Sequence, residues 1–164
     1  MHLISQLLLW KTNMSIAADY DLDFHEWITL NVELLRRGRL SEIDAAHIAE
    51  ELESMGKRDL RQLRSRLQVL VMHLLKWQYQ PERQGTSWLK TIDHQRDEIE
   101  AILLDSPSLR GTMPAALQLI YPKAVRSACH ETGLPVATFP ESCPYLLDEI
   151  LDAAFLPSDS RFNC

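Results

Sequence analysis

Glycine is scarce in this sequence, and apolar and polar residues rarely alternate as they do in a strand. The first shortage excludes a class of binding site, and the second excludes a class of fold. Only 5 glycines occur in 164 residues, so glycine-rich loops that cradle nucleotide phosphates are not expected. No GxSxG or HExxH motif is present, which removes the common signatures of serine hydrolases and zinc proteases. No segment alternates apolar and polar residues for long enough to predict a strand. The sequence therefore predicts an all-α fold.

Cysteine is also rare. The 3 cysteines, Cys129, Cys143 and Cys164, are odd in number, widely spaced and form no CxxC motif. Neither a disulfide framework nor a zinc knuckle is indicated. We interpret them as reduced thiols in a cytoplasmic protein, because structural disulfides belong to oxidising compartments.

The sequence has no long apolar run. The stretch Leu7–Trp10 is too short to span a bilayer, and no Lys or Arg precedes it as in a secretory signal. We therefore expect no membrane partner. Because patterned sequence begins only near Asp19, residues 1–18 are predicted to be a frayed or misassigned extension, with Met14 as the true start.

Composition and net charge limit the class of protein, its possible partners and the number of its domains. A hydrophobic fraction of 46% with 24% charged residues is typical of a globular protein. The formal net charge of -6 disfavours a dedicated nucleic-acid binder, because neutralising phosphates supplies much of the affinity for nucleic acid. We predict a single helical domain over residues 19–157, followed by a loose tail at 158–164.

The most strongly patterned stretch is residues 60–80. Its apolar residues recur every three or four positions, and in its second half they extend almost around the helix. Such a helix must be surrounded by others, so we predict a central helix at 57–80, ended by Pro81. The residues of this stripe are Leu60, Leu63, Leu67, Leu70, Leu74 and Trp77.

Around this central helix the pattern predicts a bundle of five to six helices. Asp21 or Asp23 can cap the first, and Gly38 can end it. Ser41 is the expected N-cap of the second, with Asp44 three residues on. Gly56 is predicted to form a turn between the second helix and the central one. The other predicted helices cover residues 21–37, 41–56, 87–104, 113–131 and 145–154.

Several phrases of the chain resemble domain-of-unknown-function family number twenty-nine, a bacterial family. The resemblance implies a compact helical fold and supplies no catalytic or binding residues to transfer. The phrases, in order, are DYDLDFHEWI (19–28), HIAEELESMGKRDLRQLRSRL (47–67), HLLKWQYQPER (73–83), SWLKTIDHQRDEI (87–99), DSPSLR (105–110) and FPESCPYLLDEILDAAFLP (139–157).

One group of polar residues flanks the predicted apolar faces. Asp44, His47 and Glu51 share one edge of the second helix, and if Gly56 is a turn, Arg66 comes level with them. We predict a buried Glu51–Arg66 pair that fixes the helix register, with His73 hydrogen-bonded nearby. A divalent metal on these carboxylate and imidazole groups is the alternative. No cofactor and no metal are included in our prediction, and no His follows a Glu by three residues as in di-iron bundles.

A second candidate surface follows the central helix. Gln78, Gln80, Arg83 and Gln84 mix with aromatic residues in a loop-like connector, and such loops on a rigid scaffold often bind partners. A connector that only caps helix ends is the competing interpretation. The leading prediction is a protein–protein interaction module that binds another protein or itself. The alternative is a metal-dependent enzyme or nucleic-acid-processing component that uses the His/Glu cluster.

Overall fold

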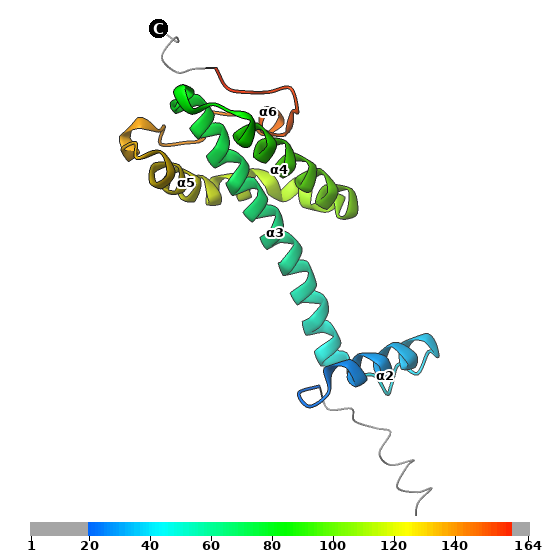
Figure 1. Cartoon of the computed structure of the whole chain (residues 1–164). Coiled ribbons are helices and arrows are strands. Elements are labelled where there is room, and N and C mark those ends of the chain that lie inside the picture. The colour runs from blue at the N-terminus through cyan, green and yellow to red at the C-terminus, as the bar shows by residue number, and fades with distance from the viewer. Residues whose placement is uncertain (1–19, 159–164) are drawn as a thin grey trace, which may run out of the picture. The chain divides into compact units, whose positions relative to one another are not determined.

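The computed structural model describes residues 20–158 and contains five α-helices and three short 3-10 helices in that range (Figure 1). No strand occurs in the described residues, so the all-α prediction is confirmed. The predictions for residues 1–18, for Met14 as the start and for nearly all of the tail lie outside the described range. The helices are α2 (Phe24–Arg36), α3 (Ala45–Tyr79), α4 (Thr86–Asp105), α5 (Met113–Thr132) and α6 (Leu147–Leu151), with η1 (Pro81–Arg83), η2 (Pro107–Thr112) and η3 (Val136–Thr138).

The chain divides into two compact units, one ending at Met55 and the other beginning at Gly56. We call them the first unit and the second unit. The prediction of one domain over residues 19–157 stays a prediction. Between residues 20 and 158 no helix is both long enough and apolar enough to cross a membrane.

The first unit consists of α2 and the beginning of α3. The carboxylate of Asp23 accepts a hydrogen bond from the Glu26 N–H at 2.9 Å, which is the predicted N-cap of α2. Gly38, with a φ of 69°, follows the end of this helix as expected. The predicted cap of the next helix was wrong. Helix α3 begins at Ala45 rather than after Ser41, and the Asp44 side chain accepts from the His47 N–H at 3.3 Å.

Gly56 does not form the predicted turn. Helix α3 continues through it without a break, so the helices predicted at 41–56 and 57–80 are one element. Gly56 does not have a positive φ, unlike Gly38 and Gly133. A glycine inside a helix costs only about 1 kcal/mol relative to alanine, and the flanking residues are mostly strong helix formers without proline. Their combined propensity outweighs that penalty.

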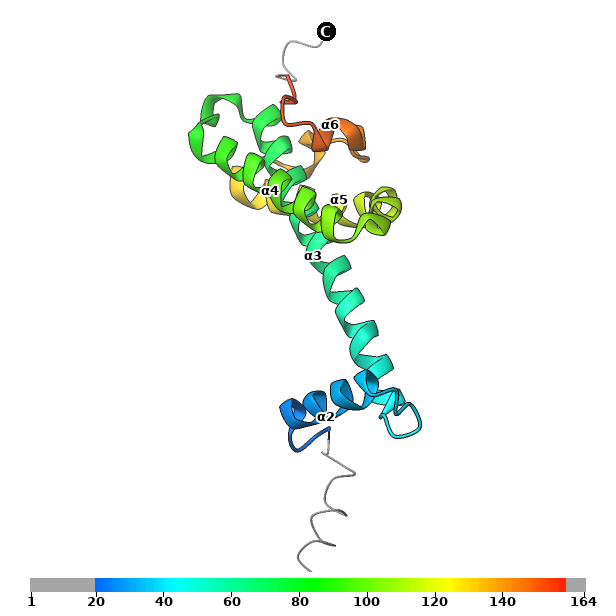
Figure 2. The same cartoon turned by 90° about the vertical axis from the view of Figure 1, so that its right-hand side faces the viewer.

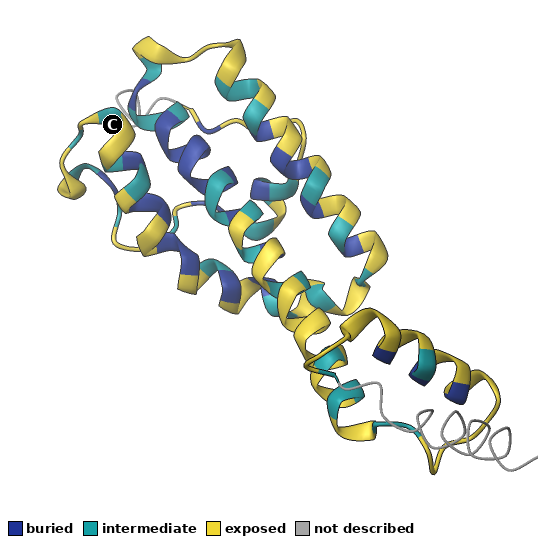
Figure 3. Cartoon of the chain, turned by 60° about the horizontal axis from the view of Figure 1, so that its bottom comes forward, coloured by how far each residue is buried: buried dark blue, intermediate teal, exposed yellow. Residues whose placement is uncertain are grey.

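In the second unit, α4, α5 and α6 pack on the C-terminal half of α3 (Figures 1 and 2). The stripe predicted on the central helix forms the core: Leu63, Leu67, Leu70 and Leu74 are fully buried. Figure 3 shows the buried positions of this unit gathered on the inner sides of its helices. The apolar partners from the other helices are Ile92, Ile99, Leu103, Met113, Ala116, Ile120, Tyr121, Ala124, Val125, Ala128 and Ile150.

Candidate interaction surface

A polar network joins α2 to the start of α3 in the first unit. The Asp44 carboxylate accepts a hydrogen bond from the Trp27 indole N–H at 3.2 Å and lies 2.6 Å from His47 Nδ1. The Asp44 backbone N–H donates to the Asn31 side-chain oxygen at 2.8 Å. The Asn31 amide in turn donates to the Trp27 carbonyl at 2.9 Å. The buried Asn31 is therefore satisfied on both sides, and the contacts fix how α2 meets α3.

Tyr20 covers this network. Its ring stacks on the His47 ring with centroids 4.3 Å apart, and it contacts the rings of Phe24 and Trp27 edge-on at 5.5 and 5.0 Å. Its hydroxyl donates to the Glu51 carboxylate. That hydrogen bond, followed by burial, raises the pKa of Tyr20 to about 12. The phenol is therefore a hydrogen-bond donor at neutral pH, not a base.

The Asp44–His47 pair is electrostatically favourable but open to solvent, with side chains 37% and 40% exposed. The hydrogen bond between them raises the pKa of His47 and lowers that of Asp44. Both shifts favour the charged forms. Because water screens such a pair, we interpret it as a positioning contact within the first unit.

Beside this network, α2 presents an apolar surface to solvent. Phe24, Ile28, Val32 and Leu35 are 45%, 37%, 37% and 42% exposed, and we call these four residues the α2 apolar face. At 100° per residue they occupy an arc of about 80°. The adjoining arc of the same helix carries the buried residues Trp27, Asn31 and Leu34. Helix α2 is thus apolar over more of its circumference than the first unit covers.

The structure separates the predicted polar cluster. Asp44 and His47 are in contact, and Glu51 joins them through Tyr20. The predicted Glu51–Arg66 pair is replaced, because α3 does not turn at Gly56 and Arg66 Nη2 lies 2.9 Å from Glu98 in the second unit. Within residues 20–158, no group of three or more His, Cys, Asp or Glu side chains could hold a metal ion.

His73 belongs to the core of the second unit. Its side chain is 9% exposed, and Nδ1 lies 2.9 Å from the Val69 carbonyl oxygen. Burial lowers the pKa of His73, an effect to which the nearby Lys76 ammonium adds. The neutral ring is the form that such surroundings favour. It serves as a satisfied polar group of the core.

The second predicted surface is only partly exposed. Gln80 is 6% exposed, and its amide donates to the Thr132 carbonyl at 3.4 Å. The Gln78 side chain accepts from the Tyr145 hydroxyl at 2.7 Å. Gln84 is exposed, and its amide donates to the Trp77 carbonyl at 2.9 Å. Three of the four residues therefore make hydrogen bonds within the chain, and Arg83 is exposed.

Two structural residues, Tyr20 and Arg96, were not predicted from the sequence. Tyr20 carried no signal beyond its place before α2. Arg96 is 6% exposed, and its guanidinium donates to the carbonyls of Ile150, Ala153 and Phe155 at 2.9, 3.4 and 2.7 Å. An arginine between the core residues Ile92 and Ile99 of α4 was the available signal, since a buried arginine needs partners.

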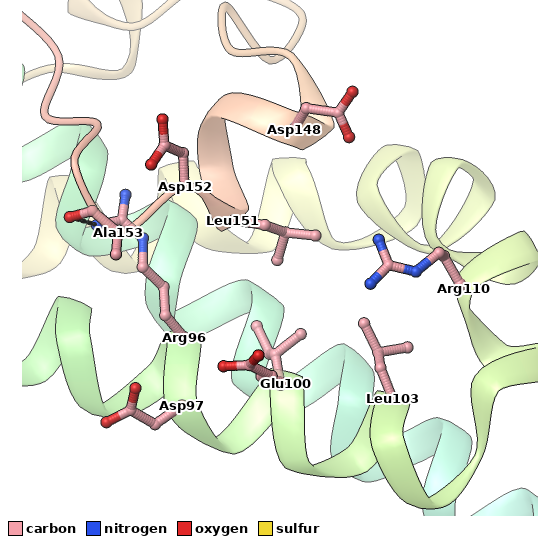
Figure 4. A pocket seen from close by; sticks show the side chains of 10 residues that line it. Arg96, Asp97, Glu100, Leu103, Arg110, Asp148, Leu151, Asp152 and Ala153 are labelled. Carbon is pink, nitrogen blue, oxygen red and sulfur yellow. Dashed lines mark hydrogen bonds between the residues drawn. The ribbon is translucent and has the colours of Figure 1, made fainter.

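A cavity of about 400 Å³ lies beside Arg96 in the second unit. Figure 4 shows Arg96 and Arg110 on opposite sides of Leu151, with Asp148 and Asp152 nearby. Because the Arg96 guanidinium is already bonded to three carbonyls, the cavity offers no buried charge for a ligand. Asp97 and Glu100 also line it.

Comparison with models of known protein families gives a match over most of the chain. A family model described as "Domain of unknown function DUF29" matches residues 20–156. Neither the search of curated proteins nor the search of solved structures found a match. The match covers both units, from Tyr20 to the segment held by Arg96. The chain therefore belongs to the DUF29 family of domains of unknown function.

Proposed function

We propose that this protein is a protein–protein interaction module and that its binding surface is the α2 apolar face. The observation that carries the proposal is the imbalance of apolar side chains in the first unit. Among the described residues of this unit, only Trp27 and Leu34 are buried hydrophobic side chains. The large hydrophobic side chains exposed there are Leu22, Phe24, Ile28, Val32, Leu35, Leu40, Leu52 and Met55.

The energetics favour a partner for this surface. Fully burying a Val, Leu, Ile or Phe side chain is worth about 1.5–3 kcal/mol. At the observed exposures, burying what the four residues of the face leave in water is therefore worth up to about 5 kcal/mol before the costs of association. Contiguous apolar surface of this kind on a small unit marks interaction sites.

The face is also well positioned to bind. The contacts of Asp44 with Trp27 and of Asn31 with the Asp44 backbone hold α2 in place before any partner arrives. A preorganised surface loses less entropy on binding. By contrast, three of the four side chains of the connector make hydrogen bonds within the chain. The four are Gln78, Gln80, Arg83 and Gln84. We therefore prefer α2 to the connector as the binding surface.

The proposed partner is a protein in the cytoplasm. Cys129 and Cys143 are both free thiols, as a reducing compartment would keep them. The net charge of -6 gives nucleic acid little electrostatic attraction. No observation favours the metal-dependent alternative over the interaction role.

The test is a crosslinked pull-down from the native host with three forms of the full chain. These are the wild type, Ile28→Asp, and Leu119→Asp as the matched control, because Leu119 is an exposed apolar residue of α5 in the second unit. Circular dichroism checks that all three are folded. A protein captured stoichiometrically by the wild type and the control, but lost with Ile28→Asp, is the expected result. Equal capture by Ile28→Asp would refute the proposed surface.

A further inference from the structure

We draw no further inference here: the strongest candidate, the apolar face that α2 exposes in the first unit, carries nothing beyond the proposed function, because nothing in the structure shows what covers it.

Discussion

The ring of Tyr20 lies flat on the ring of His47, with 13° between their planes and 4.3 Å between their centroids. The Tyr20 hydroxyl reaches Glu51, one turn further along α3. Tyr20 therefore bridges one turn of α3, from His47 to Glu51, and covers one side of the imidazole, while Asp44 holds Nδ1 on the edge of the ring. These contacts give the first unit a specific structure even though few of its apolar side chains are buried.

The Asp44–His47 pair predicts a pH dependence. The hydrogen bond to Asp44 raises the pKa of His47 above its usual value of about 6.5. A raised pKa in the folded state means that protonated His47 stabilises the fold below the unfolded pKa, and that this stabilisation is lost as pH rises through the folded pKa. The first unit should therefore become less stable as the pH increases from 6.5 towards 8. Hydrogen exchange of the α2 amides across this range measures the effect.

The control is Asp44→Asn, which removes the largest cause of the shift. In this variant the imidazole signals of His47 should titrate at a lower pH than in the wild type, as followed by NMR. The amide exchange of α2 should then vary less with pH. Identical titration curves for the two proteins would show that Asp44 does not set the protonation of His47.

The continuity of α3 predicts that Gly56→Ala stabilises the protein. Gly56 is helical, and a Cβ added there would meet no heavy atom within 4 Å. Alanine should raise the free energy of unfolding by about 0.5–1 kcal/mol, because it loses less conformational entropy than glycine in a helix. Urea unfolding followed by circular dichroism measures the difference.

Gly133→Ala is the matched control for that substitution. Gly133 ends α5 with a φ of 73°, a conformation that side-chain-bearing residues rarely adopt. Alanine there should destabilise the protein by about 1 kcal/mol. If Gly56→Ala were destabilising to the same degree, the chain at Gly56 would be a turn in solution and not a helix.

The contrast between these glycines explains how far the sequence could predict the structure. The all-α class and the stripe from Leu63 to Leu74 followed from periodicity alone, because a core helix must place its apolar residues on one side. The prediction of a turn at Gly56 was wrong. A single glycine is compatible with both a turn and a helix, and the neighbouring residues decide between them. The contacts of Tyr20 and Arg96 depend on which distant segments meet. No local pattern encodes those meetings.

A second prediction on stability concerns Lys76. Its side chain is 6% exposed, and its ammonium pairs with Glu131 and lies 4.5 Å from the centroid of the Trp88 ring. Glu131→Ala would leave this buried charge without its carboxylate and should cost about 1–3 kcal/mol of unfolding free energy. Lys76→Met removes the charge but keeps the buried stem, so it should cost less than Glu131→Ala. Equal losses in urea unfolding would mean that packing, not charge, dominates.

The last prediction concerns the guanidinium of Arg96, which joins α4 to the segment that follows α6. Its three hydrogen bonds, to the carbonyls of Ile150, Ala153 and Phe155, need the planar fork of arginine. Arg96→Lys retains the charge but cannot reach all three carbonyls from one nitrogen, so it should destabilise the protein by about 2 kcal/mol or more. The loss should be concentrated at the C-terminal segment, where amide exchange of Ala154 and Phe155 should accelerate more than that of Leu70. Uniform acceleration across the second unit would instead show that Arg96 supports the whole core and not this segment alone.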